Sequence, residues 1–159
     1  MEIYLLRHAL AGNAKPGQPD SERALTEEGR EKLTRVLKRA HAAGVKPHAI
    51  LSSPYRRALE TAALAAEALG YSGEIERIRA LEPDVSPYDV WDEIRRRVPD
   101  GPLLLVGHEP LLSALAAYLL NSPALLIDMK KSALVRVDCE RAGPQPKCAL
   151  KWIITPVTA

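Results

Sequence analysis

The sequence predicts an α/β fold, a three-layer sandwich whose mostly parallel central sheet has helices on both faces. Short, continuously apolar runs at residues 3–6 and 103–106 are typical of strands that are buried on both faces. Segments with helical periodicity follow such runs, so strand and helix alternate through most of the chain. The length of 159 residues suits one hydrophobic core, and we expect a single domain over residues 1–159.

The first strand, residues 3–6, leads into residues 10–25, which are rich in glycine and proline and have no periodicity. Loops of this length in compact domains are commonly functional or disordered. Thr26 is expected to cap the helix that follows, and Gly44 is expected to end it. A second buried strand is expected at residues 49–51.

Ser53 is expected to cap the next helix, with Pro54 at its first position and Gly70 at its end. Residues 75–78 predict a third strand, and residues 86–89 indicate a capping box that opens a further helix. The apolar face expected for that helix consists of Val90, Trp91, Ile94 and Val98. The strand at 103–106 and its helix come next, and two strands, 134–137 and 150–154, complete the prediction.

Charge and hydropathy exclude several kinds of partner. The chain has 22 basic and 20 acidic residues, and without a clustered basic face we expect no nucleic-acid partner. No apolar stretch approaches a membrane span, and the N-terminus lacks the parts of a signal peptide. We therefore expect a cytoplasmic protein without a membrane partner.

The two cysteines, Cys139 and Cys148, form no CxxC motif and have no histidine close in sequence. Zinc and redox motifs are therefore unsupported. The pair could flank a hairpin, but nothing else indicates secretion, so reduced, inert thiols are expected.

Charged and imidazole side chains are predicted to meet at one edge of the sheet. Arg7 and His8 follow the first strand, and His108 follows the strand at 103–106. Arg57 falls in the first turn of the helix after the second strand. Ligands of open α/β sheets bind beyond the carboxyl ends of parallel strands. Two arginines and two histidines at this edge predict a site for a phosphate dianion.

The residue types at this edge also suggest a reaction. Guanidinium groups can grip several phosphate oxygens in fixed geometry. A neutral imidazole, whose pKa is ordinarily near ~6.5, is a competent nucleophile that can form a phosphoramidate. The second histidine can stabilise charge as it shifts among the phosphoryl oxygens. The arginines neutralise the phosphate, so no metal and no cofactor are expected.

Each of these residues alone has a simpler explanation as part of a loop, a turn or a helix surface, so the prediction depends on the set. Nearby polar residues favour structural roles. Arg56 is interpreted as a surface residue and Glu60 as an ion-pair partner rather than a base. His41 and His48 are interpreted as solvated.

Four short motifs occur in order along the chain. They are Arg-His-Ala at residues 7–9, Leu-Thr-x-x-Gly at 25–29, Ser-x-x-x-Arg-Ala-x-x-Thr at 53–61 and Val-Gly-His-Glu-Pro at 106–110. Together they resemble the histidine phosphatase superfamily, also called phosphoglycerate mutase-like. Within it, the chain is most similar to the short SixA-type phosphohistidine phosphatases.

This resemblance implies a phosphoglycerate mutase-like fold and a phosphatase that forms a phosphohistidine intermediate on His8. It implies that Arg7, Arg57 and His108 bind the phosphoryl group and take part in catalysis. No metal and no cofactor are implied.

The sequence departs from the family pattern at two places. Ala9 replaces the glycine after the nucleophile. The catalytic acid of larger members is a glutamate after the third strand, and by register its place falls on Ala80. Glu82 or Asp84 could substitute for it, and Glu82 could equally be a surface residue.

The acid bears on the substrate, because an alkoxide is a poor leaving group without a proton donor whereas imidazole leaves readily. The chain is also too short for inserted lids. Both points favour phosphohistidine on a protein as the substrate. The alternatives are a phosphatase for small phosphate esters, such as sugar or nucleotide phosphates, and a phospho-binding module without turnover. A mutase is less favoured.

Overall fold

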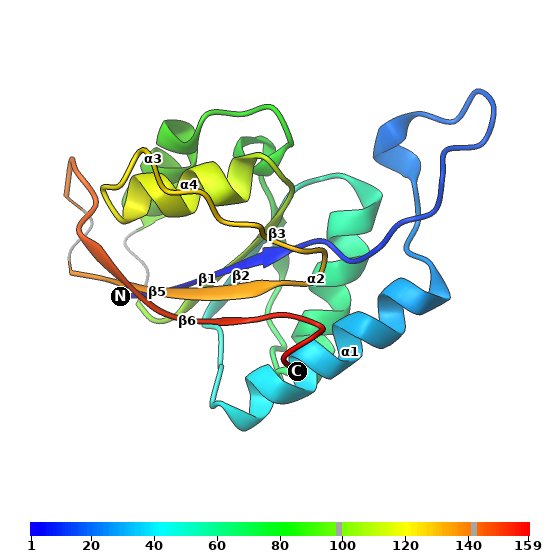
Figure 1. The fold of residues 1–159 in the computed structure, drawn as a ribbon, viewed down its shortest axis with the longest axis horizontal. Coiled ribbons are helices and arrows are strands. Elements are labelled where there is room, and N and C mark those ends of the chain that lie inside the picture. Colours follow the sequence, from blue (N-terminus) through cyan, green and yellow to red (C-terminus); the bar gives the residue numbers. More distant parts are fainter. Residues whose placement is uncertain (98–99, 141–142) are drawn as a thin grey trace.

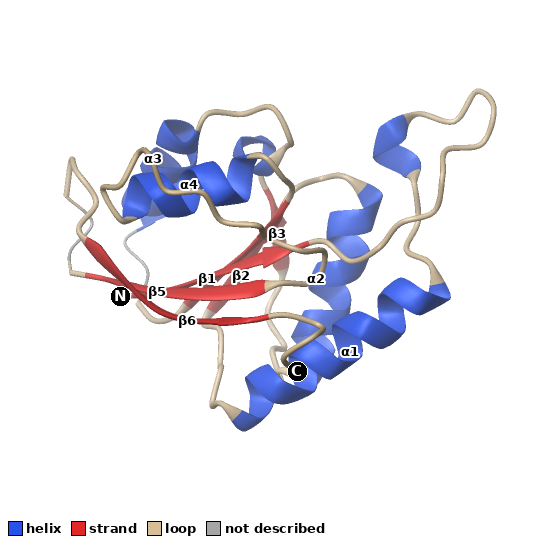
Figure 2. Ribbon diagram, viewed as in Figure 1, coloured by secondary structure: helices blue, strands red, loops and turns tan. Residues whose placement is uncertain are grey.

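The computed structural model describes residues 1–97, 100–140 and 143–159. Within them the chain forms a central sheet with helices on both faces (Figures 1 and 2). The strands are β1 (Glu2–Arg7), β2 (Ala49–Ser52), β3 (Ile75–Arg77), β4 (Leu103–Gly107), β5 (Leu134–Cys139) and β6 (Cys148–Ile154). The helices are α1 (Glu27–Ala42), α2 (Arg56–Ala68), α3 (Pro87–Arg97) and α4 (Leu111–Leu119), with short 3₁₀ turns η1 (Asp20–Glu22) and η2 (Arg79–Leu81).

The six-stranded sheet has the order β3-β2-β4-β1-β5-β6. Strands β1 to β4 are parallel to one another, and β5 and β6 add an antiparallel hairpin at the edge beside β1. The prediction of a mostly parallel sheet with helices on both faces is therefore confirmed. β1 and β4 are adjacent and in register, with Arg7 opposite Gly107.

Both faces of β1 are buried, which explains its continuous apolar sequence. Ile3 and Leu5 pack in the hydrophobic cluster that includes α3 and α4. Tyr4 and Leu6 pack in the cluster on the opposite face, with α1 and α2. Figure 1 shows these helix pairs above and below the sheet. The two cores hold the carboxyl ends of β1 and β4 in fixed positions.

The helix boundaries follow the sequence with one exception. Thr26 caps α1 by accepting a hydrogen bond from the amide of Gly29 at 2.9 Å, and Gly44 follows the helix with a φ of 80°. The prediction that Ser53 caps α2 is wrong, because the helix begins only at Arg56. The Ser53 side chain instead contacts a histidine of the candidate site.

The helix predicted from residues 86–89 is α3. The hydroxyl of Ser86 accepts a hydrogen bond from the amide of Tyr88 at 3.3 Å in its first turn. Of its predicted apolar face, Val90, Trp91 and Ile94 are buried, while Val98 lies outside the described residues. None of the described helices is both long and apolar enough to span a membrane.

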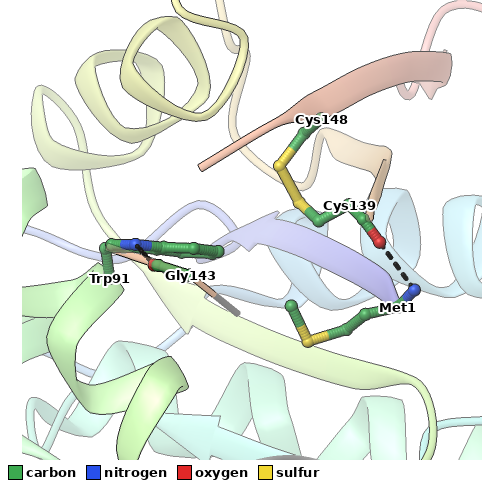
Figure 3. The surroundings of a disulfide bond; sticks show 5 residues. All are labelled: Met1, Trp91, Cys139, Gly143 and Cys148. Atoms are coloured by element: carbon green, nitrogen blue, oxygen red, sulfur yellow. Dashed lines mark hydrogen bonds between the residues drawn. A yellow bond between two sulfur atoms is a disulfide. The ribbon is translucent and has the colours of Figure 1, made fainter. Parts of the chain in front are cut away.

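Cys139 and Cys148 form a disulfide, so the prediction of reduced thiols is wrong. The physical reason is their register, because they lie opposite each other on β5 and β6 with their Cα atoms 4.0 Å apart. Figure 3 shows the surroundings of this bond. The amino group of Met1 donates to the carbonyl of Cys139 at 2.8 Å, and the indole of Trp91 donates to the carbonyl of Gly143 at 3.1 Å. The hairpin is thereby attached to both β1 and α3.

Candidate active site

The structure brings the four predicted site residues to one edge of the sheet. Arg7 ends β1 and His8 follows it, while His108 directly follows β4. The His8 amide donates to the carbonyl of Gly107 at 2.9 Å, and the rings of His8 and His108 lie 5.1 Å apart between centroids. Arg57 reaches the same edge from the first turn of α2. His8, Arg57 and His108 are buried, with exposures of 6%, 4% and 1%.

The imidazole of His8 is oriented by its own chain. Its Nδ1 lies 2.7 Å from the carbonyl oxygen of Ala9, which can only accept, so Nδ1 carries the proton and Nε2 carries the free electron pair. Burial, together with the positive charges of Arg57 and Arg7, lowers the pKa of His8 to about 4. His8 is therefore neutral at pH 7, which is the form that a nucleophile requires.

In both arginines at least one outer nitrogen donates a hydrogen bond, while the inner nitrogen, Nε, has no partner. Nη1 of Arg7 donates to the carbonyl of Met129 at 2.7 Å. Arg57 donates from Nη1 to the carbonyl of Asp20 at 2.9 Å and from Nη2 to its carboxylate at 3.1 Å. The Nε atoms of both arginines are buried without a hydrogen-bond partner.

Buried polar atoms normally have partners, so unpaired ones need an explanation. Across the described segments, the buried side-chain nitrogen and oxygen atoms without a partner are Nε of Arg7, Nε of Arg57, Nδ1 of His108 and Nε of Arg95. Three of these four belong to the predicted site. Nitrogen donors without acceptors, on two cationic side chains and a histidine, are what a phosphoryl group needs.

His108 is oriented by Ser53, whose hydroxyl lies 2.8 Å from Nε2. The amide of Tyr55 already donates to that hydroxyl oxygen at 3.2 Å. We assign the hydroxyl proton to the bond with Nε2, since a neutral ring then carries its proton on the unpartnered Nδ1, where it can be donated to a phosphoryl oxygen. Burial and the nearby His8 and Arg57 lower the pKa of His108 to about 3, so it is a neutral donor at pH 7.

Thr61 connects the segment that follows His8 to the start of α2, where Arg57 lies. Its hydroxyl accepts a hydrogen bond from the amide of Ala9 at 3.0 Å and donates to the carbonyl of Arg57 at 2.7 Å. Ser53 and Thr61 are positions of a motif in the sequence, but the motif alone did not indicate a role for either residue in the site. The signal that could have found them is their place at the two ends of the motif that contains Arg57, since both carry short hydroxyl side chains able to bond within a buried site.

Ala9 fits where the family pattern has glycine. Its side chain is fully buried in the core, and its φ is not positive, so the backbone there does not require glycine. The glycine at position 29 does have a steric reason. A Cβ on Gly29 would lie 2.3 Å from the carbonyl oxygen of Leu10, which also accepts from the amide of Thr26 at 2.9 Å. The Leu-Thr-x-x-Gly motif thus packs the start of α1 against the segment after His8.

The structure does not bring the candidate acids to the four site residues by any direct bond. Glu82 follows η2 and Asp84 is exposed. Among the described residues, no hydrogen bond or ion pair joins either carboxylate to Arg7, His8, Arg57 or His108. The role of Glu82 as an acid stays a prediction.

The neighbouring polar residues have the structural roles that the sequence favoured. Glu60 accepts from the amide of Leu25 at 3.0 Å and pairs with Arg30 at 2.9 Å. Arg56 is exposed and lies 3.6 Å from Glu60. His41 and His48 are exposed as well. The predictions for these residues are confirmed.

A family model described as histidine phosphatase superfamily (branch 1) matches residues 3–82. The chain belongs to this superfamily. An uncharacterized protein from Picosynechococcus is 31% identical to this chain over 137 residues, which cover 85% of this chain and 83% of the relative.

Solved structures of superfamily proteins have the same fold. The protein histidine phosphatase SixA in complex with tungstate matches with a TM-score of 0.86 at 22% identity, covering 99% of this chain and 98% of SixA. A protein from Agrobacterium tumefaciens, provisionally assigned as the phosphohistidine phosphatase SixA, matches with a TM-score of 0.84 at 25% identity. That match covers 98% of this chain and 97% of the other. The predicted SixA-like, phosphoglycerate mutase-like fold is confirmed, and family and fold together support phosphatase activity.

Proposed function

We propose that this histidine phosphatase removes the phosphoryl group from a phosphohistidine on a partner protein, with His8 as the nucleophile. One observation carries the proposal. The neutral His8, with its electron pair on Nε2, lies at the same sheet edge as Arg7, Arg57 and His108, each of which has a buried nitrogen without a partner. Such a site has both a nucleophile and donors for the group that it attacks.

The reaction has two steps. In the first, Nε2 of His8 forms a bond to phosphorus while the phosphorus–nitrogen bond of the substrate breaks. The substrate ring, protonated by solvent on its other nitrogen, takes the electron pair of that bond and departs as neutral imidazole. In the second, water attacks phosphorus, the bond to His8 breaks, and inorganic phosphate leaves with the hydroxyl from that water. Arg7 and Arg57 donate to the phosphoryl oxygens in both steps, and Nδ1 of His108 adds a neutral donor.

The carboxylates near the site favour a substrate whose leaving group needs no proton donor. Asp20 is the carboxylate bonded directly to a site residue. Partial burial opposes its ionisation, but hydrogen bonds and charge from Arg23 and Arg57 outweigh this and lower its pKa. An ionised Asp20 cannot supply a proton, and Glu82 has no bond to the site. Imidazole leaves readily without such help, whereas an alkoxide does not.

The structural match to SixA proteins supports the same substrate class. A phosphohistidine-carrying protein, an alkyl phosphate and an aryl phosphate, assayed side by side, test the proposal. The expected order of kcat/KM is phosphohistidine protein first, aryl phosphate second and alkyl phosphate last. The highest kcat/KM on a sugar or nucleotide phosphate would contradict the proposed substrate. If none of the three substrates is turned over, the chain is instead a phospho-binding module.

A further inference from the structure

The segment between β1 and α1 reaches the active site through one residue. It extends beyond the end of β1 in Figure 1 and contains η1, whose first residue is Asp20. The carbonyl and carboxylate of Asp20 accept hydrogen bonds from both terminal nitrogens of Arg57, at 2.9 and 3.1 Å. Asp20 itself is exposed, whereas Arg57 is buried. An exposed loop residue therefore holds a buried phosphate-binding side chain.

A carboxylate on this arginine could act in two opposite ways. It could compete with phosphate as a substitute anion, or it could orient the guanidinium for phosphate. The two roles differ in which edge of the guanidinium is occupied. Asp20 takes the end formed by Nη1 and Nη2, while Nε of Arg57 is buried and unpartnered. The edge formed by Nε and Nη2 thus keeps donors for a phosphoryl oxygen.

Arg7 has a similar arrangement of one bonded outer nitrogen and one unpartnered inner nitrogen. Its Nη1 is bonded to the carbonyl of Met129, and its Nε is buried without a partner. In both arginines an oxygen acceptor from a surrounding loop holds the outer nitrogen, and the inner nitrogen stays free. This repetition favours orientation over competition, because the acceptor at Arg7 is a neutral carbonyl that cannot mimic phosphate.

Asp20 is itself held firmly enough to orient another side chain. Its second carboxylate oxygen accepts from Nε of Arg23 at 2.8 Å, and Arg23 also donates to the carbonyl of Gly12 at 3.1 Å. The carboxylate therefore lies between two arginines, with one oxygen bonded to each. Its negative charge also offsets part of the positive charge of Arg57 and Arg23.

We propose that Asp20 is a positioning residue, which fixes the guanidinium of Arg57 with its Nε edge toward the phosphoryl group. The proposal rests on the proposed role of Arg57 in binding phosphate. It gives a role to the loop at residues 10–25. The sequence predicts this loop from its length and composition but indicates no specific role for it. In this proposal the loop at residues 10–25 orients Arg57 for phosphate binding and does not compete with phosphate for it.

The test compares Asp20→Ala and Asp20→Asn with Glu22→Gln, an exposed acid of the same short turn whose side chain has no contact with the site. Turnover of p-nitrophenyl phosphate and competitive inhibition by inorganic phosphate are measured for each. Misalignment of a binding group commonly costs about 10–100-fold, so Asp20→Ala should lower kcat/KM roughly tenfold or more and weaken phosphate inhibition. Asp20→Asn keeps an oxygen acceptor and should lose less. Glu22→Gln should match the wild type.

A second comparison separates positioning from a general effect on folding. Asp20→Ala is introduced into the Arg57→Ala variant, where a positioning residue has nothing left to position. The proposal expects no further loss of phosphate affinity in this double variant. Higher activity in Asp20→Ala would show competition, unchanged activity would show no role, and a full additional loss without Arg57 would show a structural role. Each of these results overturns the proposal. A failure of the Arg57 assignment is seen separately, in Arg57→Ala alone.

Discussion

The hydroxyl of Ser53 lies 2.8 Å from Nε2 of His108, although the two residues are 55 positions apart in sequence. β2 and β4 are neighbours in the sheet, so the residues that follow them meet at its edge. Ser53, expected from the sequence to cap a helix, instead fixes the ring of the second histidine. This contact occupies Nε2, so in the proposed mechanism Nδ1 is the nitrogen of His108 that donates to the phosphoryl group.

Replacing Ser53 with alanine should therefore lower kcat. The change leaves a buried ring nitrogen without a partner and removes the control of the tautomer, at a cost of roughly 1–3 kcal/mol. We expect a loss of about tenfold or more. Ser52→Ala is the neighbouring control, because that buried hydroxyl donates to the backbone carbonyl of Ser53 at 2.9 Å, whereas the His108 ring is bonded to the hydroxyl of Ser53. Equal effects of the two changes would contradict the role of Ser53.

Arg57 and Arg56 form a natural pair for testing the phosphate site. Arg57 is buried at the site, while its neighbour is exposed and paired with Glu60. A hydrogen bond to a charged group is worth about 1.5–3 kcal/mol, so Arg57→Ala should lower kcat/KM at least about tenfold. Arg56→Ala should change it little, as is usual for an exposed ion pair. A larger loss of kcat/KM from Arg56→Ala than from Arg57→Ala would show that Arg56, and not Arg57, is the arginine of the phosphate site.

The two site histidines should make the folded protein sensitive to moderate acid. Burial and nearby charge lower the pKa of His8 to about 4 and of His108 to about 3, whereas both approach ~6.5 in the unfolded chain. Between these values the unfolded state binds more protons, so stability falls as the pH falls. Each histidine contributes a slope of up to about 1.4 kcal/mol per pH unit.

Urea unfolding of the wild type and His8→Gln at pH 7, 6 and 5 measures this slope. The variant should lose less stability between pH 6 and 5 than the wild type. His41→Gln, which removes an exposed imidazole outside the site, is the control for the substitution itself. An identical slope in wild type and His8→Gln would show that His8 titrates normally.

Within the described parts of the chain, neither Glu82 nor Asp84 is bonded to the site, and this predicts a steep dependence of the rate on the leaving group. General acids commonly contribute about 10²–10⁴-fold, so a gap of that order is expected between p-nitrophenyl phosphate and glycerol phosphate. Glu82→Gln then tests the remaining candidate. If Glu82 is the acid, the variant loses activity on alkyl phosphates while keeping it on phosphohistidine. If alkyl phosphates are hydrolysed rapidly and substitution of Glu82 or Asp84 does not slow this hydrolysis, another group supplies the proton.

The sequence was sufficient for the fold and for the four central residues because both follow from local patterns. Continuous apolar runs mark strands buried on two faces, and the residues after parallel strands must share an edge. Arg7, His8 and His108 could therefore be placed together without coordinates. Arg57 followed from its position one turn into a helix.

The parts that could not be predicted depend on contacts between distant segments. The hydrogen bond from Arg57 to Asp20 spans 37 positions and involves a segment without periodicity. The disulfide depends on the register of β5 and β6, which the spacing of Cys139 and Cys148 does not determine. The different role of Ser53 arose because a hydroxyl near a helix start has two possible partners, and only the fold shows which one it has.

The central claim is that His8 carries the phosphoryl group during turnover. Rapid quenching of the wild type with radiolabelled phosphohistidine protein should trap a phosphoenzyme that is labile in acid and stable in base, as a phosphoramidate is. His8→Ala should form no labelled enzyme and should have no turnover, while Arg57→Ala should still form some label more slowly. A label that persists in His8→Ala, or turnover without His8, would contradict the account.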